Sequence, residues 1–163
     1  MRERRLVWID LEMTGLHPDE GDCIIEIATI VTEADLSIVA EGPVFAITPN
    51  DVSKLDNMDE WNTRTHTASG LVDRVRNEGV SVVEAEEGTL NFLKEHCPPN
   101  LPLAGSSFHH DRRFIRREMP RLDEFLSYRI VDVSSFKEMV RRWYPDLPRH
   151  LKPTNHKALE DIR

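Results

Sequence analysis

The sequence predicts an α/β fold built on a mixed sheet, in which an antiparallel meander precedes parallel strands and helices pack against the sheet. Three strand-like runs come first along the chain, and strand and helix patterns alternate after them, an order typical of such sheets. The length of 163 residues falls in the range of one domain, and no linker-like stretch divides it. We therefore expect a single domain over residues 1–163.

The three early strands are predicted from runs rich in β-branched and other apolar residues. They span residues 5–11, 23–32 and about 36–47, and short polar links join them, as in an antiparallel meander. Gly42 and Pro43 interrupt the third run. Because proline cannot donate a hydrogen bond to a sheet, this interruption indicates a bulge or an edge strand.

The middle of the chain has the patterns of helices. Residues 53–76 resemble a series of short helices. Ser81 with Glu84 forms a capping-box signature before a helix that runs to about Cys97, where two consecutive prolines stop it. The first strand–helix alternation follows these prolines.

Residues 101–105 predict a short buried strand. The next helix is expected to begin near His110, and it places Phe114, Ile115 and Met119 on one apolar face. The pattern then repeats, so this part of the chain favours parallel strands joined by helices.

Residues 129–133 predict the last strand. A helix opened by Ser134 or Ser135 is expected to follow it, with Glu138 completing a second capping box.

The segment 145–155 contains three prolines and predicts a loop before a last helix that starts around Asn155 or His156. Asp161 lies five residues after His156, a separation that does not stack two side chains on one helical face. We therefore expect the histidine in the loop or the first turn and the aspartate one turn deeper. Thr154 or Asn155 is a suitable N-cap for this helix.

Composition excludes several classes of protein. A net charge of −8 argues against tight, unspecific binding of long nucleic acid, but it allows a short nucleic acid held through cations. Two cysteines, Cys23 and Cys97, are too few for a disulfide framework, which favours reduced thiols and the cytoplasm. The apolar run near the start is short and is cut by Asp10 and Glu12, and no run is long enough to span a membrane.

Asp10 and Glu12 form the first informative pair, because residues two apart in a strand point to the same side of a sheet. Among 29 acidic residues, pairs with this spacing should arise by chance about five times, so the spacing alone carries no weight. The pair is informative because it lies in the most strand-like segment of the sequence. Two carboxylates in a predicted central strand cost stability, and a bound cation would offset that cost.

Asp111 is expected in the first turn of a helix, with Ser106 and Ser107 available as caps. An aspartate there is stabilised by the helix dipole whether or not it has a function. Four arginines follow it and are interpreted mainly as a solvated helix face: Arg112, Arg113, Arg116 and Arg117.

Taken together, these carboxylates and one histidine come from separate elements and suit one task. Two Mg²⁺ or Mn²⁺ ions can activate a water and stabilise the leaving oxygen of an in-line phosphodiester displacement. Such hard cations prefer carboxylate oxygens, which Asp10, Glu12, Asp111 and Asp161 supply. A neutral imidazole, here His156, can take the proton from that water.

The same residues resemble the oligoribonuclease family of the DEDDh exonucleases. Residues 8–16 (WIDLEMTGL) are similar to the first exonuclease motif, residues 111–114 to the second, and residues 156–163 to the third. Residues 61–71 (WNTRTHTASGL) are similar to oligoribonucleases more specifically. The resemblance implies an RNase H-like fold, a homodimer, and 3′-to-5′ processing of RNA of two to a few nucleotides into mononucleotides.

The resemblance also implies the roles of the chemical groups. Asp10 would bridge both metals, Glu12 and Asp161 would complete one metal site, Asp111 would hold the other, and His156 would be the general base. Because the family's last helix would continue beyond the end of this sequence, we expect that helix to be truncated here.

Substrate contacts are implied from two subunits. In one subunit a leucine would wedge against a base, a tryptophan and a histidine would line the pocket, and a serine would contact the substrate: Leu16, Trp61, His66 and Ser107. Three residues of the other subunit would close off the 5′ phosphate: Tyr128, Arg129 and Ser134. Taken on their residue types alone, the aromatic side chains are more often core or interface residues, although stacking of a base on an aromatic ring contributes about 1–3 kcal/mol.

Two other functions remain open from the sequence. One is a DEDDh exonuclease that acts on longer RNA or DNA, because its chemistry would be identical. The other is a nucleotide-binding module that keeps the fold without turnover. Dependence of the rate on substrate length separates the first from an oligoribonuclease, and loss of hydrolysis on replacing Asp10 separates the second.

Overall fold

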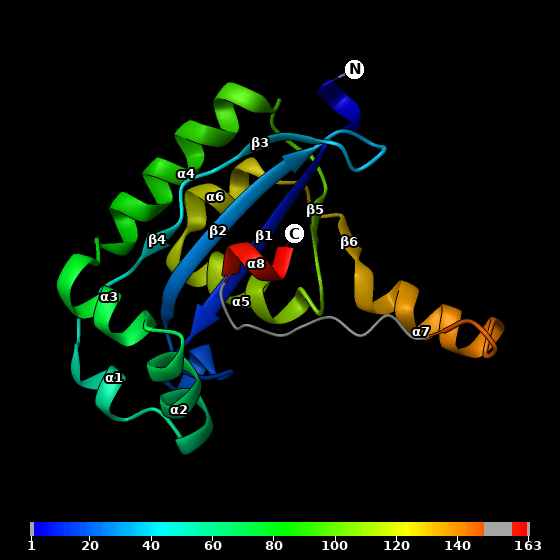
Figure 1. Ribbon diagram of the computed structural model, residues 1–163. Helices are drawn as coiled ribbons and strands as arrows, with labels where there is room; N and C mark the ends of the chain where they lie inside the picture. Colours follow the sequence, from blue (N-terminus) through cyan, green and yellow to red (C-terminus); the bar gives the residue numbers. More distant parts are fainter. Residues whose placement is uncertain (1, 149–157, 163) are drawn as a thin grey trace.

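The computed structural model describes residues 2–148 and 158–162. Within these residues six strands form one mixed sheet, in which β3, β2, β1, β5 and β6 are neighbours in that order and β4 also pairs with β2 (Figure 1). The strands are β1 (Leu6–Met13), β2 (Ile24–Thr32), β3 (Ile38–Glu41), β4 (Phe45–Ala46), β5 (Leu103–Gly105) and β6 (Ile130–Asp132). β1, β2 and β3 pair antiparallel, whereas β1–β5 and β5–β6 are parallel. The predicted meander followed by parallel strands is confirmed.

The third predicted strand is divided at Gly42 and Pro43, as expected. β3 and β4 lie on either side of this dipeptide and both pair antiparallel with β2. The Gly42 N–H donates to the carbonyl oxygen of Thr29 at 2.8 Å, so the chain stays on β2 between the two short strands. The proline, which has no N–H to donate, therefore falls at an interruption of the sheet edge.

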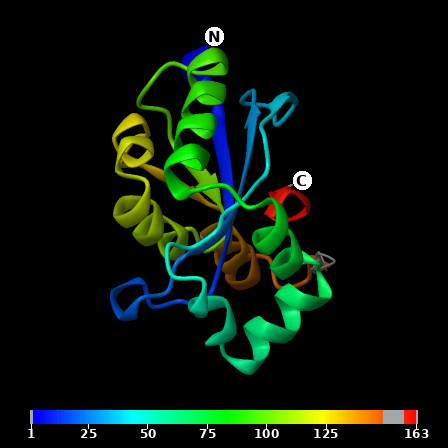
Figure 2. The same cartoon turned by 90° about the vertical axis from the view of Figure 1, so that its left-hand side faces the viewer.

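Helices surround the sheet on both faces. α4 (Val82–His96), α5 (His109–Glu118) and α6 (Pro120–Phe125) lie on one side and α8 (Ala158–Ile162) on the other, as Figure 2 shows. The short helices expected over residues 53–76 are α1 (Ser53–Asp56), α2 (Glu60–Ala68) and α3 (Leu71–Glu78). α7 (Val133–Trp143) follows β6, and two 3-10 turns, η1 (Arg2–Arg4) and η2 (Pro18–Glu20), flank β1. The predicted capping box is present at Ser81 and Glu84 of α4.

The main core forms where β1 meets the helices of one face. Val7, Ile9 and Leu11 alternate along β1 and pack in one cluster with Leu93 of α4 and Phe114 of α5. Full burial of each such side chain contributes about 1.5–3 kcal/mol relative to its exposure. This packing sets the rotation of β1, so its alternate residues face the side on which α8 lies.

Helix α7 begins earlier than the sequence predicted. Its N-cap is Asp132, whose side chain accepts from the Ser134 N–H, and neither Ser134 nor Ser135 has that role. The second capping box is also wrong, since Glu138 pairs with Arg142 one turn later. The physical reason is that β6 ends at Asp132, and its short carboxylate reaches the free N–H groups of a helix that starts at once.

Helix α5 begins near His110 as predicted, but without the serine cap that we expected. Its N-cap is Phe108, with no side-chain hydrogen bond. The hydroxyls of Ser106 and Ser107 instead contact the Ser134 hydroxyl at 3.0 and 2.9 Å. These serines therefore join the start of α5 to the start of α7.

Helix α7 extends away from the sheet in Figure 1, and none of its residues is buried. Four apolar side chains repeat along it at helical spacing and are exposed: Phe136, Met139, Val140 and Trp143. Residues three, four and seven apart share one side of a helix. We call these four residues the α7 apolar face. Among the residues that the structure describes, none covers this face fully.

The expectations for the cysteines and for the last helix can be checked only where the structure describes the residues. Cys23 and Cys97 are both free and buried. Nowhere in residues 2–148 or 158–162 is there a helix with the length and apolar character needed to cross a membrane. The last helix is present as α8, but its predicted start and cap, the end of the proline-rich loop and His156 lie outside the described residues.

Candidate active site

Three of the predicted carboxylates meet on the face of the sheet that α8 covers. Asp10 and Glu12 project from β1, and Asp161 comes from α8, which packs on both β1 and β2. One carboxylate oxygen from each lies within 4.8 Å of the others. Residues separated by about 150 positions therefore form one cluster of hard oxygen ligands, which could hold a divalent metal ion.

Asp111 approaches from the end of the sheet. It lies in the first turn of α5, is 7% exposed, and its Oδ1 accepts a hydrogen bond from the Leu11 N–H at 3.2 Å. This bond ties the start of α5 to the residue between Asp10 and Glu12. The Asp111 charge also lies close enough to Glu12 to raise the pKa of that carboxyl group.

Burial and mutual repulsion raise the pKa values of the carboxyl groups in this site. Burial, followed by the charges of Glu26, Asp161 and Asp111, raises the pKa of Glu12 to about 8. Burial likewise raises the pKa of Asp111 to about 7, although the hydrogen bond from Leu11 lowers it in part. At neutral pH Glu12 is mostly protonated and Asp111 partly so, and a divalent cation would displace these protons because its positive charge favours the ionised carboxylates. The donor set therefore fits such an ion.

A pH dependence of stability follows from the raised pKa of Glu12. Because the folded state raises it from 4.5 to about 8, the proton is held more tightly when folded, and that stabilisation is lost as pH rises through this range. In EDTA we expect the melting temperature to fall by about 5 °C or more between pH 6 and 8.5. Glu12→Gln should flatten this fall, and so should saturating Mn²⁺. If the melting temperatures of the unmodified chain and of Glu12→Gln fell equally with pH in EDTA, the prediction would be contradicted.

His66 lies directly behind the acidic cluster. It is 1% exposed on α2, its Nε2 donates to the Met13 carbonyl oxygen at 3.0 Å, and its Nδ1 lies 3.8 Å from Glu12 Oε2. His66 therefore contacts the end of β1 and the Glu12 carboxylate, and its role in lining a substrate pocket, which the family resemblance implies, stays a prediction.

Leu16 and Trp61 are the two exposed apolar groups of this region, at 49% and 50% exposure. Leu16 directly precedes a tight turn, in which Asp22 accepts from the His17 N–H at 2.8 Å. A Cβ at Gly15 would meet the Asp22 carboxylate, which would then have to move and give up this hydrogen bond. Leu16 beside the turn and Trp61 of α2 both remain about half exposed to solvent.

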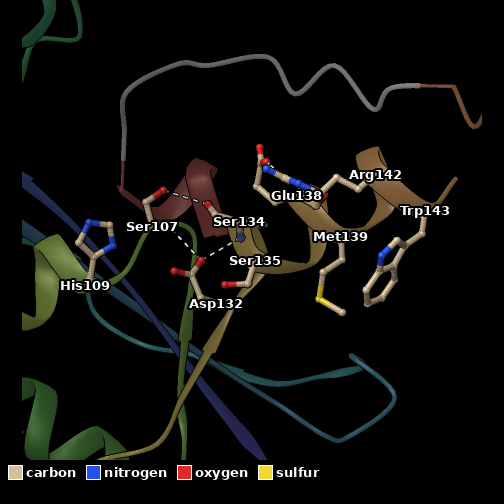
Figure 3. Close-up of a pocket in the computed structure, with 9 residues that line it drawn as sticks. All are labelled: Ser107, His109, Asp132, Ser134, Ser135, Glu138, Met139, Arg142 and Trp143. Atoms are coloured by element: carbon tan, nitrogen blue, oxygen red, sulfur yellow. Dashed lines mark hydrogen bonds and ion pairs between the residues drawn. The ribbon is translucent and has the colours of Figure 1, made fainter. Parts of the chain in front are cut away.

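A second polar group forms where β5 and β6 end. Asp132 Oδ1 accepts from the backbone N–H groups of both Ser107, at 2.9 Å, and Ser134, at 2.8 Å (Figure 3). Ser107 has a φ of 56°, the left-handed region that a non-glycine residue seldom adopts, so this bond holds a strained backbone. The two predicted substrate-contact serines thus lie together at an open cleft of about 610 Å³, which extends along α7 to Met139 and Trp143.

Replacing Asp132 with alanine should destabilise the protein by about 2 kcal/mol, because it removes a helix cap and a second hydrogen bond to a strained residue. Asp59→Ala is a matched control, since Asp59 caps α2 through the Asn62 N–H at 2.7 Å and also accepts from the Asn62 side chain at 2.8 Å, with no link to a strained residue. It should cost only about 1 kcal/mol. Urea unfolding measures both variants, and an equal or smaller loss for Asp132→Ala would contradict this interpretation.

The remaining predicted contacts lie before β6. Tyr128 is 79% exposed, and Arg129 stacks on it with the guanidinium carbon 5.6 Å from the ring centroid. The Arg129 Nε also donates to the tyrosine hydroxyl at 3.3 Å. Both side chains of this pair are therefore largely exposed in the single chain, and their predicted role at a partner's site stays a prediction.

The sequence reasoning missed Glu26. This glutamate lies on β2 directly opposite Glu12 and is 2% exposed. The available signal was a single charged residue within the apolar run CIIEIATIVT. A charge in a strand that is buried on both faces requires partners, and these partners prove to connect it with α8.

In comparisons with known proteins, this chain matches an exonuclease family and curated oligoribonucleases. A family model described as an exonuclease matches residues 7–163. An oligoribonuclease from Marinobacter nauticus is 53% identical over 161 residues, which cover 98% of this chain and 88% of that protein. An oligoribonuclease from Vibrio cholerae is also 53% identical, over 163 residues that cover 99% of this chain and 89% of that protein.

Solved structures of exonuclease I share the fold at low identity. One matches with a TM-score of 0.72 and 18% identity over 97% of this chain and 38% of that chain. The E. coli enzyme in complex with a dT13 oligonucleotide gives 0.73 and 15% over the same shares, so this chain spans well under half of exonuclease I. These likenesses confirm the RNase H-like mixed sheet. The family model and the close relatives show that this chain belongs to the oligoribonuclease family of exonucleases.

Proposed function

We propose that this chain is a metal-dependent 3′-to-5′ exoribonuclease that hydrolyses very short RNA, dinucleotides especially, to 5′-mononucleotides. The convergence of Asp10, Glu12 and Asp161 beside the buried Asp111 carries this proposal. Membership of the oligoribonuclease family supports the choice of substrate.

Two divalent cations, Mg²⁺ or Mn²⁺, are assigned to the acidic cluster. Asp10 would contribute to both sites, Glu12 and Asp161 would complete one, and Asp111 would hold the other. When bound, such a pair activates a water and stabilises the leaving oxygen of an in-line displacement at phosphorus. His156 is assigned as the general base that accepts the proton of that water, because a neutral imidazole titrates near the working pH.

The binding of short RNA is assigned to groups around the cluster. A dinucleotide offers few phosphates, so its affinity must come from stacking, from metal contacts and from closure on its ends. Leu16 and Trp61 are exposed and can contact the bases, and base stacking contributes about 1–3 kcal/mol. The hydroxyl of Ser107 is assigned to the substrate, while His66 supports Glu12 from behind and borders the pocket.

A homodimer completes the site in this proposal. The α7 apolar face of Phe136, Met139, Val140 and Trp143 is exposed in the single chain, and a second copy would remove it from water. Tyr128, Arg129 and Ser134 then contribute to the partner's site and close off the 5′ phosphate. This closure limits the length of RNA that the site accepts.

Residues 1–163 are proposed to act as one exonuclease domain. A cytoplasmic location is proposed with it, which the free thiols of Cys23 and Cys97 support.

A product time course tests this function directly. Labelled RNA of two to seven nucleotides with a 5′ phosphate is incubated with the full chain in Mn²⁺ and in EDTA. We expect mononucleotides to appear from the 3′ end in Mn²⁺ alone, with the dinucleotide consumed fastest. Faster cleavage of the seven-nucleotide RNA would favour an exonuclease of longer substrates. No hydrolysis at any length would favour a nucleotide-binding module.

A further inference from the structure

Glu26 is a buried carboxylate in the middle of β2, where every residue of the strand is buried. It faces Glu12 across the β1–β2 pair, so two acidic side chains lie opposite each other next to the acidic cluster. A buried charge destabilises the fold unless partners compensate it, and like charges in opposite positions add to that cost. Such an arrangement needs specific partners to persist.

The two oxygens of Glu26 bind two different elements. Oε1 accepts from Arg74 Nη1 of α3 at 2.5 Å, and Oε2 accepts from the Ala158 backbone N–H at 3.0 Å. Ala158 is the first described residue of α8 and is fully buried. Hydrogen bonds to an ionised acceptor are about twice as strong as neutral ones. One side chain therefore joins β2, α3 and the start of α8.

The position of α8 decides whether the acidic cluster forms. Asp161 comes from the next turn after Ala158, so the helix carries a displacement at Ala158 on to the Asp161 carboxylate. Short helices have little stability of their own and depend on tertiary contacts. The Glu26 bond fixes α8 at one point on the sheet, on the strand beside the one that carries Asp10 and Glu12.

We propose that Glu26 is a positioning residue that, with Arg74 as its charge partner, fixes the start of α8 so that Asp161 meets Asp10 and Glu12. This inference rests on the proposed function in one respect, namely that the cluster binds divalent cations. Each Glu26 oxygen accepts one of these bonds, so we assign Glu26 an effect through α8 in addition to the effect of its charge on Glu12. Its loss should therefore weaken cation binding while leaving the chemical groups of the site in place.

Direct binding of Mn²⁺ to the full chain, measured by calorimetry without RNA, tests this role. Glu26→Ala removes both bonds and should weaken Mn²⁺ binding by about 10-fold, as losses of supporting partners around metal ligands do. Glu26→Gln keeps an oxygen that can accept from Ala158 and should weaken binding less. Arg74→Gln removes the charge partner and should also weaken it.

Glu33→Gln is the matched control, because Glu33 follows β2 and pairs with Arg5 Nη2 at 2.7 Å, without contact to α8. This variant should bind Mn²⁺ as the unmodified chain does. A second signature concerns dinucleotide hydrolysis: the Glu26 variants should need more Mn²⁺ for half-maximal rate, and saturating Mn²⁺ should restore most of the maximal rate. Circular dichroism checks that each variant is fully folded at the assay temperature, because a fully folded variant with intact α8 placement would not shift the Mn²⁺ midpoint.

Equal Mn²⁺ affinity in Glu26→Ala and Glu33→Gln would overturn the inference. If Glu26→Ala fails to fold, the Gln variants of Glu26 and Arg74 decide in the same way, and affinity equal to the control would again overturn it. The proposed function is tested separately. A chain that binds Mn²⁺ with the expected Glu26 dependence but hydrolyses no RNA would remove the function and leave the positioning role standing.

Discussion

Asp10→Asn should abolish Mn²⁺-dependent hydrolysis of a 5′-phosphorylated dinucleotide, with a loss of at least about 1,000-fold in rate, equivalent to several kcal/mol of transition-state stabilisation. Asp10 is assigned to both cations, so its loss affects the whole site. Asparagine has nearly the same shape as aspartate, but its neutral amide is a poorer ligand for a hard cation. The β1 packing of Val7, Ile9 and Leu11 on the opposite face does not depend on it.

The control is Asp56→Asn, which changes an aspartate of α1 that pairs with Arg76 outside the acidic cluster. Rates are measured by chromatography of the mononucleotide product, and circular dichroism during heating checks the fold of both variants. Asp56→Asn should hydrolyse the dinucleotide like the unmodified chain. Retention of more than about a tenth of the activity by a folded Asp10→Asn protein would contradict the assignment of Asp10 to both cations.

The unmodified chain should sediment as the proposed homodimer, and Phe136→Glu should convert it into a monomer, with a rise in the dimer dissociation constant of at least about 100-fold. Phe136 belongs to the α7 apolar face, and a glutamate there would have to lose water without a partner when a second copy binds. Dinucleotide hydrolysis should fall with dimerisation, because Tyr128 and Arg129 are assigned to the site of the partner.

Val83→Glu is a close control, because Val83 on α4 is 60% exposed and Phe136 is 58% exposed, and in both variants an exposed apolar side chain becomes glutamate. Sedimentation velocity over a range of concentrations measures the association state of each variant. Val83→Glu should remain dimeric. A Phe136→Glu protein that sediments as the unmodified chain does would show that α7 is not the interface.

The sequence was sufficient for the local part of the site. The apolar run of β1 has the period of a strand, and that period alone places Asp10 and Glu12 on one face. The three-strand meander, the capping box of α4 and the strand–helix alternation also follow from local patterns. Each depends on interactions between residues that are near in sequence, where pattern reasoning is informative.

The rest of the site depends on contacts over long sequence separations. The bond from Leu11 to Asp111 joins residues 100 positions apart, and the bond from Ala158 to Glu26 joins residues 132 apart. No spacing rule could place Asp111 and Asp161 beside β1, so their grouping was expected only from the separate requirements of metal chemistry and from family resemblance. Pattern also misplaced the start of α7, because Val133 has a high strand propensity although it is the first helical residue.

Anomalous diffraction from crystals of the full chain soaked in Mn²⁺ is the most direct measurement of the acidic cluster. A peak at the manganese absorption edge should lie in contact with carboxylate oxygens of Asp10, Glu12 and Asp161 together. Peaks at other carboxylates only, with none among these three, would contradict the metal site on which the proposed hydrolysis depends.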